Sequence, residues 1–521
     1  MKILNKLSNI NIVKTLALLI PLLSSCQDFL EENPPGILTK SNFYKTEADA
    51  ISAVDALYAT IQSRTNGMYW GEFFSKTDVN TDDMFVDPGV GNVAWQEWGR
   101  LNIYPEIGQL LDVWNHHYLM IGRANAAIEY ISTDLEIRDR LLGEAKFFRA
   151  LAYFDLVRFF GDVPMTYSVI TNLDDAVQIA STRTPSVEIY NMIEQDLLDA
   201  EKDLPDTWAG ANAGRVTAGT AKGLLSKVYL TWAGEPLRDV SKYQLAADKA
   251  GEVVNNRSRY GYDLEDNYMD VFENDLSKES LFEGQMVQGL GNEGALAGIQ
   301  FLPRNLTPIL GPSYRGNALM RPTPDLINSY DPSDLRLQTA FFTSLSNADG
   351  SATATFDPHV FKYIEVEDIL YQGLILNDGN RNTKILRFAD ILLIYAEALN
   401  EANSGPTTAA FDAIDEVRNR AGLIDLSTTL SQNDFREAVY LERRLELFAE
   451  NIRWFDLVRQ GRYISTMESF SNTLQDYPNP ATASTMVIEK NVQSHFNLLP
   501  IPKSQLDILE LEEDIQNPGY Q

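Results

Sequence analysis

Apolar residues recur at helical spacing along most of this chain, and the helices that they predict follow one another in pairs. One helix is predicted over 139–160, where Gly161 and Pro164 give a typical helix ending, and its partner is predicted over 186–204. Further helices are predicted over 48–61, 110–131, 217–233, 243–255, 385–402, 407–421 and 433–460. Helix pairs of this length are typical of tetratricopeptide-like stacking, although the full consensus of that repeat is absent. We therefore expect a mainly α fold, a superhelix of irregular tetratricopeptide-like helix pairs.

Two long stretches lack this helical pattern, at about 62–109 and about 256–384. The first is rich in glycine, aspartate and aromatic residues, and the second in glycine, proline, asparagine and serine. Loops of this length inside a compact domain are usually functional or contain small elements of their own. We expect the helix pairs to form the scaffold of a single body over 26–521, and the two stretches to carry the ligand surface.

The N-terminal residues have the layout of a secretory signal, and the only cysteine of the chain follows them directly. Three lysines and no acidic residue precede Cys26, together with a short apolar run and two serines. Small residues before a cysteine fit a bacterial lipoprotein signal over 1–25, after which the Cys26 thiol takes up lipid and anchors the protein. A plain signal peptide or an N-terminal membrane helix is the alternative, but the apolar run is short and Pro21 breaks it.

The charge balance argues against one class of partner. The chain has 43 Lys and Arg against 73 Asp and Glu, which gives a formal net charge of -30. An acidic body of this kind repels nucleic-acid phosphates, so nucleic acid is not an expected partner. Because there is no second cysteine, stability has to come from burial and hydrogen bonding instead of disulfides.

The sequence contains no motif that supports catalysis or a cofactor. It has no His-Glu-x-x-His, no cysteine pair and no Gly-x-Ser-x-Gly. The Gly-x-Gly-x-x-Gly at 289–294 lacks the acidic residue that a dinucleotide site needs about 20 residues later. The acids at 78–83 begin like a calcium loop, but Asp83 and Gly89 stand where that loop has glycine and glutamate. We expect solvated turn acids or a helix cap there, with calcium as an alternative, and no catalytic residue, metal or cofactor.

A series of short strings runs in order through nearly the whole chain after the signal. They are Cys-Gln-Asp-Phe-Leu at 26–30, Arg-Ala-Asn at 123–125, Glu-Ala-Lys-Phe-Phe-Arg-Ala at 144–150, Gly-Arg-Val-Thr at 214–217, Arg-Pro-Thr at 321–323, Leu-Arg-Phe-Ala-Asp at 386–390, Glu-Arg-Arg-Leu-Glu-Leu at 442–447, Arg-Trp-Phe-Asp at 453–456, Leu-Pro-Ile-Pro at 499–502 and Asn-Pro-Gly-Tyr at 517–520. As an ordered set they resemble the SusD/RagB family of Bacteroidota outer-membrane lipoproteins.

This resemblance implies a scaffold of irregular tetratricopeptide-like pairs, in agreement with the helix pairs above. It also implies a lipid-anchored protein of the outer membrane, exposed on the cell surface, that caps a SusC-type TonB-dependent transporter. Family members bind oligosaccharides, or peptides in RagB-like cases, and pass them to the transporter without catalysis. For the charged motif residues we expect helix-packing ion pairs and no site: Arg387, Asp390, Glu442, Arg444, Glu446, Arg453 and Asp456.

Aromatic residues in the two irregular stretches are the candidates for ligand contact. A sugar ring packs its C–H face on an indole or phenol plane, while amide and charged groups bind the hydroxyls. The candidates are Trp70, Trp95, Trp98, Tyr314 and Tyr371. One helical turn would place Trp95 and Trp98 on the same side, and Trp95 is the strongest candidate. Trp70 and Trp98 are equally compatible with burial beneath the loop.

Four functions remain open from the sequence. The first is a surface lipoprotein that captures glycans and delivers them to the transporter, and the second is a peptide-binding lid of the same kind of transporter. A peptide site would need backbone-pairing edges and charge matching more than flat aromatic platforms. The third is a lipid-anchored glycosidase, although no pair of carboxylates stands out among the 73 acids. The fourth is a structural plug for the transporter without affinity of its own.

Overall fold

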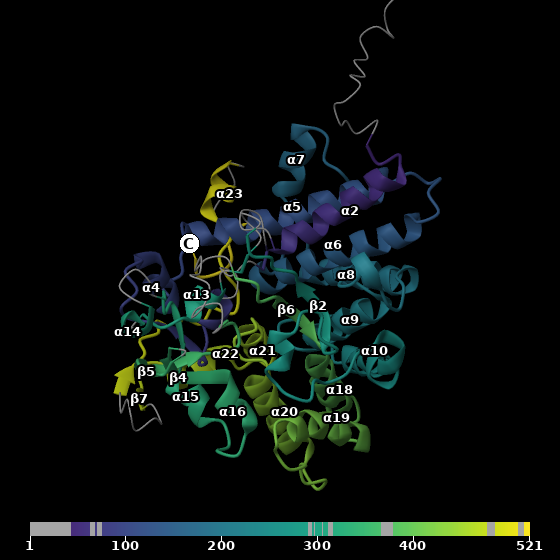
Figure 1. Cartoon of the computed structure of the whole chain (residues 1–521). Coiled ribbons are helices and arrows are strands. Elements are labelled where there is room, and N and C mark those ends of the chain that lie inside the picture. Colours follow the sequence, from purple (N-terminus) through teal and green to yellow (C-terminus); the bar gives the residue numbers. More distant parts are fainter. Residues whose placement is uncertain are drawn as a thin grey trace, which may run out of the picture.

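Helices dominate the computed structural model of this chain, and the strands within its described residues are short and paired (Figure 1). The structure describes residues 43–62, 68–69, 76–289, 294–295, 297–304, 306–310, 316–347, 349–365, 379–476, 485–508 and 515–520. The mainly α fold predicted from the sequence is confirmed. Among the described helices, none has both the length and the apolar character that a membrane span requires.

The long helices stack side by side through much of the molecule, largely in chain order (Figure 1). They are α2 (Glu47–Gln62), α5 (Gly108–Tyr130), α6 (Arg138–Phe160), α8 (Ser186–Asp203), α9 (Ala218–Ala233), α10 (Lys242–Asn255), α18 (Phe388–Ala402), α19 (Thr408–Arg420) and α20 (Gln432–Glu446). Each of α5, α6, α8, α9 and α10 packs on the next one, and α10 then packs on α18, which contacts both α19 and α20. The predicted helix pairs are therefore present, and their boundaries agree within a few residues.

Helix α6 shows why this stack holds together. It packs against α2, α5, α8 and α9, so almost every side of it is covered. Its aromatic side chains Phe147, Phe148, Tyr153 and Phe154 are at most 1 % exposed. Its buried residues lie on all sides of the helix instead of along one stripe, as expected at such a central position. It ends as predicted at Gly161, which has a positive φ of 70° and donates its N–H to the Val157 carbonyl.

The remaining residues form small elements beside the stack. The strands are β1 (Met84–Val86), β2 (Ser280–Gly284), β3 (Met320–Pro322), β4 (Phe341–Ser346), β5 (Thr353–Val360), β6 (Thr383–Arg387), β7 (Leu474–Asp476) and β8 (Thr485–Val487). The short helices are α4 (Val93–Gly99), α7 (Leu173–Ala180), α11 (Arg257–Tyr260), α12 (Asp270–Glu273), α13 (Ala297–Phe301), α14 (Thr307–Leu310), α15 (Pro324–Asn328), α16 (Leu335–Ala340), α21 (Arg453–Arg459), α22 (Tyr463–Phe470) and α23 (Lys503–Ile508).

Four antiparallel strand pairs are present among the described residues, and the first two connect segments that lie far apart in the sequence. They are β1 with β3, β2 with β6, β4 with β5, and β7 with β8. In the first pair, Phe85 lies opposite Arg321, so the two stretches that lack helical spacing meet in one sheet. Both stretches therefore contain small elements of their own, as their length suggested.

The helix predicted over 433–460 is wrong, because the chain breaks into α20 and α21. Ala449 and Asn451, between the two helices, adopt positive φ values of 57° and 61°. The Asn451 side chain accepts a hydrogen bond from the Thr77 hydroxyl at 2.7 Å, and its N–H donates to the Asp78 carboxylate at 3.2 Å. Contacts with a segment more than 370 positions away therefore stabilise a backbone that local periodicity does not reveal.

A buried network of charges joins the end of α20 to α18 and to the segment before β2. Arg387 contacts Glu446 at 3.0 Å and Glu450 at 2.7 Å, and it also pairs with Glu279. All four side chains are at most 3 % exposed. Removing one partner from a buried pair leaves an uncompensated charge, at a cost of about 3–5 kcal/mol.

The other charged motif residues are paired as well, and for Asp390, Asp456 and Glu442 these pairs join helices as predicted. Asp390 and Asp456 each contact Arg443 at 2.8 Å, and Glu442 contacts Arg336 at 2.7 Å. Arg444 and Arg453 pair with two acids of the 78–83 segment. The charged residues of the motif strings in the C-terminal third therefore form a buried network of ion pairs.

Candidate functional site

Helix α4 carries the two tryptophans that the sequence singles out. Asn92 begins this helix, because its side chain accepts a hydrogen bond from the Ala94 N–H at 3.0 Å. Trp95 and Trp98 lie one turn apart and share a side, as predicted, but that side faces the core. Trp95 is 9 % exposed and Trp98 is 2 % exposed.

The position of Trp98 is explained by its hydrogen bond. Its indole N–H donates to the Lys76 carbonyl at 2.9 Å, so the ring is held beneath the loop. This agrees with the alternative of burial that the sequence left open for Trp98. A stacking role for Trp95 stays a prediction, and its low exposure does not favour it.

The other sequence candidates cannot be placed. Trp70, Tyr314 and Tyr371 lie outside the described residues, and so does Cys26. The roles given to them from the sequence remain predictions.

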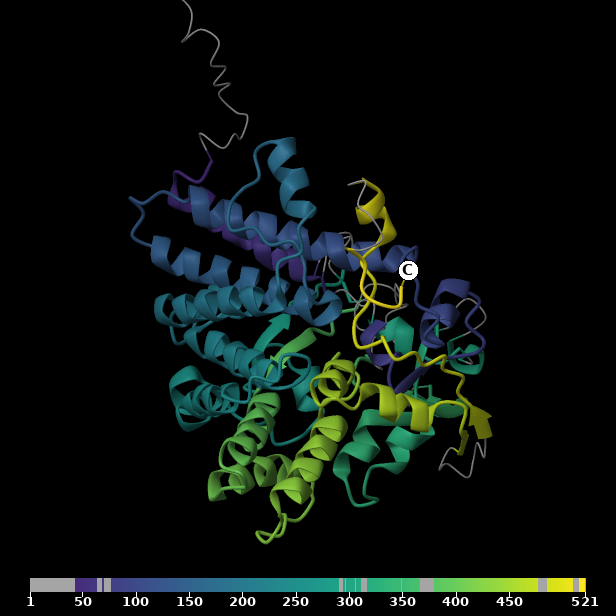
Figure 2. The ribbon, with the colours of Figure 1, turned by 180° about the vertical axis from the view of Figure 1, so that it is seen from behind.

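A cleft of about 540 Å³ opens between the segment that follows α4 and the C-terminal residues. It is lined by Leu101, Asn102, Ile103, Tyr104, Pro105, Glu106, Asn491, Gln493, His495, Phe496, Lys503, Leu506, Gln516, Gly519 and Tyr520. Figures 1 and 2 show the C-terminal end of the chain between α23 and α4, on the side of the stack where α5 begins. Ligand pockets in proteins commonly have volumes of about 300–1,000 Å³.

Amide side chains form a hydrogen-bonded row along one side of the cleft. Asn102 donates to the Glu97 carboxylate at 2.9 Å, and its amide oxygen accepts from Asn491 at 3.1 Å. The Asn491 oxygen in turn accepts from Gln493 at 3.0 Å. These bonds orient each amide but use only one of its two N–H hydrogens. The row can therefore donate to and accept from further polar groups in the cleft.

Aromatic rings give another part of the same cleft a flat, less polar surface. The His495 ring packs edge-on against Tyr520 at 4.4 Å and against Phe496 at 4.7 Å between ring centroids. Tyr104 lies in the lining and is 45 % exposed, so its ring is available to a ligand. Flat rings of this kind pack well on the C–H faces of other molecules.

The C-terminal wall of the cleft is tied firmly to the helix stack. The Gln516 side chain exchanges two hydrogen bonds with the Ile501 backbone, at 2.7 and 2.8 Å. The Asn517 amide donates to the carbonyls of Phe160 and Leu499. The Tyr520 hydroxyl donates to the Leu498 carbonyl at 2.8 Å. The rings therefore sit on a positioned backbone at the end of α6.

Few charges line the cleft. Burial lowers the pKa of His495, so its imidazole is neutral at pH 7. Lys503 is paired with Asp507 at 3.0 Å, and Glu106 is exposed at the rim. The interior of the cleft is thus mostly aromatic and amide in character.

A second, smaller hollow of about 210 Å³ lies next to the cleft. Gln96, Gly99 and Arg100 of the α4 region line it, together with residues 486–489 and parts of β1. The Asn491 N–H donates to the Arg100 carbonyl at 2.7 Å, so this backbone contact separates the hollow from the cleft.

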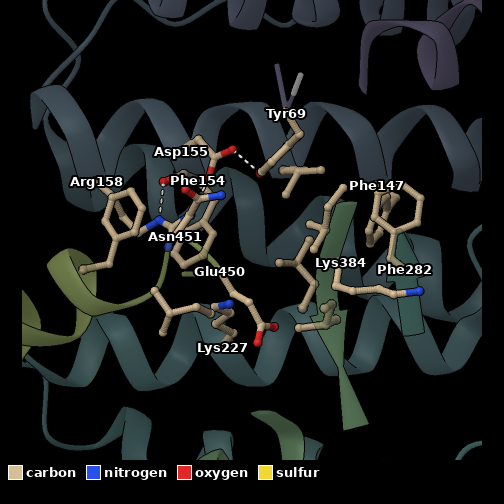
Figure 3. A pocket seen from close by; sticks show the side chains of 16 residues that line it. Tyr69, Phe147, Phe154, Asp155, Arg158, Lys227, Phe282, Lys384, Glu450 and Asn451 are labelled. Carbon is tan, nitrogen blue, oxygen red and sulfur yellow. Dashed lines mark hydrogen bonds and ion pairs between the residues drawn. The ribbon is translucent and has the colours of Figure 1, made fainter. Parts of the chain in front are cut away.

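A small cavity of about 30 Å³ lies at the junction between α6, α9 and the β2–β6 pair, and charged side chains are part of its lining (Figure 3). Asp155 accepts hydrogen bonds from Tyr69 and Arg158 there. Burial alone would raise the pKa of Asp155, but Arg158 and His117 hold that pKa below its ordinary value. A space of this size holds about one water molecule, so it is too small for a substrate.

The acids at 78–83 are neither solvated turn residues nor a helix cap, contrary to expectation. Asp82 and Asp83 are at most 3 % exposed. Asp82 pairs with Arg453 at 2.8 Å and Asp83 with Arg444 at 2.6 Å, so buried arginines neutralise them. Within the described residues, no group of three or more His, Cys, Asp or Glu side chains is arranged to hold a metal ion.

Sequence reasoning missed the contribution of the last 30 residues to the cleft. In the sequence these residues are notable only for their family-like strings, and the cleft forms because they fold back onto residues 101–106. The Lys503 N–H donates to the Pro105 carbonyl at 2.9 Å. The available signal was the concentration of Asn, Gln, His and aromatic residues between 491 and 496.

Comparison with known proteins gives a consistent result along the chain. A model described as the SusD family matches residues 347–520, and a model described as starch-binding, associating with the outer membrane, matches residues 28–230. A SusD-like protein of Formosa agariphila is 30 % identical, over 85 % of this chain and 90 % of its own length.

Solved structures share the fold over the whole body. The SusD homologue from Bacteroides thetaiotaomicron has a TM-score of 0.77 at 26 % identity and covers 92 % of this chain and 98 % of its own. A laminarin-binding SusD-like protein has a TM-score of 0.72 at 26 % identity and covers 92 % of this chain and 100 % of its own.

Proposed function

This chain belongs to the SusD/RagB family, and from that premise we propose that it captures oligosaccharides outside the cell and does not cleave them. Relatives support the cargo, since one of similar structure is described as laminarin-binding. The absence of a catalytic motif from the sequence supports binding over cleavage.

The cleft of about 540 Å³ is the proposed capture site. The observation that carries this assignment is the combination of an oriented amide row with an aromatic wall in one cleft. Sugar hydroxyls both donate and accept hydrogen bonds, as the amides of Asn102, Asn491 and Gln493 do. The C–H faces of a sugar ring match flat aromatic surfaces such as Tyr104.

The first experiment is a calorimetric titration with α- and β-glucans, fructans, mannans and host glycans. It uses protein without residues 1–26, which keeps every described residue because these lie within 43–520. We expect one glycan class to bind and to be recovered unshortened. Shortened products would favour the glycosidase, and binding of peptides alone would favour the RagB-like lid. If nothing binds, a plug without affinity is favoured.

A tyrosine exchange tests the location of the site. Tyr104→Ala removes the exposed ring of the cleft and is expected to weaken binding of the identified glycan by about 1–2 kcal/mol. Tyr167→Ala is the matched control, because Tyr167 is 57 % exposed and does not line the cleft. Equal affinities for the two variants and the unaltered protein would place the site elsewhere.

Attachment to the outer membrane through lipid on Cys26 is the second part of the proposal. The family description of association with the outer membrane supports the location, and the signal-like residues 1–25 support the anchor. Cys26→Ser is expected to release the protein from the membrane fraction into the soluble fraction. Retention of this variant in the membrane would contradict the lipid anchor.

Delivery to a SusC-type transporter is the third part. Helix α7 projects from the stack (Figures 1 and 2). Exposed apolar side chains on this helix and just before it support a partner on that side of the molecule. Ile170, Leu173 and Val177 are 40 %, 76 % and 42 % exposed, and α7 has no buried residue. A photo-crosslinker at position 173 should join the protein to a TonB-dependent barrel; cross-links only to other proteins would contradict this contact.

A further inference from the structure

The charged side chains around the cleft include cations that are paired with carboxylates and the exposed carboxylate of Glu106. Two cations at the cleft are paired with carboxylates, Arg100 with Glu489 at 3.6 Å and Lys503 with Asp507 at 3.0 Å. The carboxylate of Glu106 lies in the lining and projects from an exposed residue. The immediate surroundings of the cleft are thus neutral or negative.

Positive charge is scarce among the described residues that line the cleft. Among the described lining residues, Lys503 is the only lysine or arginine, and the neighbouring histidine, His495, has a lowered pKa because it is desolvated. The amide row ends on the carboxylate of Glu97, which accepts from Asn102. Among the described lining residues, a bound carboxylate or sulfate would therefore meet neutral amides, like charges and a single ammonium group, that of Lys503, which is already paired with Asp507.

We infer that the cleft selects uncharged oligosaccharides and rejects polyanionic ones, such as uronate-containing or sulfated glycans. The inference rests on the proposed function and names the class of glycan for the same site. Amides and tyrosine rings recognise hydroxyls and C–H faces without any need for charge. A polyanion forms no ion pair with these groups and is repelled both by the rim and by a body with a net charge of -30.

Titration with matched glycans tests this selection. Short laminarin and xyloglucan oligosaccharides serve as uncharged probes, and oligogalacturonate and alginate oligosaccharides of equal length serve as acidic probes. We expect an uncharged probe to bind at least about tenfold more tightly than any acidic one. Its affinity should change by less than about twofold between about 20 mM and about 500 mM NaCl, because no ion pair forms.

A charge reversal makes the test specific to the cleft. Glu106→Lys is expected to strengthen binding of the acidic probes by about fivefold or more at low salt, measured relative to its effect on the uncharged probe. Glu136→Lys is the matched control with the same change in net charge. Glu106 precedes α5 and Glu136 follows it, so a helix of 23 residues, about 34 Å long, separates the two positions.

The outcomes separate this inference from the proposed function. Tight, salt-sensitive binding of an acidic probe to the unaltered protein would overturn the inference and leave glycan capture intact. Equal effects of Glu106→Lys and Glu136→Lys would also overturn it, because the selection would then come from overall charge. Failure of every glycan, acidic or uncharged, would contradict glycan capture itself and the inference with it.

Discussion

At the scale of single residues, one glycine shapes the aromatic wall of the cleft. Gly519 has a positive φ of 89°, a conformation that side chains with a Cβ rarely adopt. A Cβ at this position would lie 2.3 Å from the His495 ring, which is far inside van der Waals contact. The family-like Asn-Pro-Gly-Tyr string therefore has a physical reason to contain glycine at 519.

Gly519→Ala is expected to displace the His495 ring and weaken glycan binding. The backbone strain alone amounts to about 1–2 kcal/mol, and the clash adds to it. Titration with the identified glycan and thermal unfolding together check the prediction. Gly91→Ala is the control, since a Cβ there meets no atom within 4 Å. Unchanged affinity in the Gly519 variant would mean that the His495 wall does not contact the ligand.

A buried tryptophan behaves differently from an exposed stacking platform. Because Trp95 is 9 % exposed, Trp95→Ala should create a cavity and reduce the free energy of unfolding by about 3–5 kcal/mol. Chemical denaturation measures this loss. A variant with unchanged stability but weakened glycan binding would restore Trp95 as a ligand contact.

At the scale of elements, α4 depends on a single cap. Asn92→Ala removes the acceptor for the Ala94 N–H and is expected to cost about 0.5–2 kcal/mol of folding stability. Asn172→Ala removes the equivalent cap of α7, whose side chains are not buried, and should affect global unfolding less. Denaturation of the two variants side by side checks this, and a larger loss for Asn172→Ala would contradict the comparison.

The elements also show how far sequence reasoning reaches. The helix pairs were predictable because amphipathic spacing and glycine-proline endings are local signals, as at the end of α6. The break between α20 and α21 was not, because Thr77 and Asp78 stabilise the backbone of Asn451 from the other end of the sequence. The spacing of Trp95 and Trp98 correctly placed them on one side, but periodicity cannot tell which side of a short helix faces the core.

At the scale of the whole molecule, a buried lysine joins distant parts of the chain. Lys490 is 3 % exposed and donates to the carbonyls of Val79 and Met84. Its desolvation lowers the pKa to about 7. Between about pH 7 and its unfolded pKa of about 10.4, the unfolded chain binds more protons than the folded one. Stability from this group therefore rises with pH over that window.

Lys490→Met removes the titrating amine and should change the pH dependence accordingly. The stability of the variant relative to the unaltered protein is expected to be highest near pH 6 and to fall by up to about 1 kcal/mol per pH unit above pH 7. Denaturant unfolding at about pH 6, 8 and 9.5 measures this. Lys202→Met, at a side chain that is 82 % exposed, is the control. A difference that does not vary with pH would contradict the prediction.

The two walls of the cleft come from residues 101–106 and from residues 491–520, and this separation has a consequence for biosynthesis. A ribosome that makes the chain from its N-terminus completes the helix stack long before it completes the cleft. A chain that is truncated or clipped before residue 491 can still contain most of the scaffold, yet it lacks one wall of the site. Ligand binding would thus distinguish finished molecules from unfinished ones.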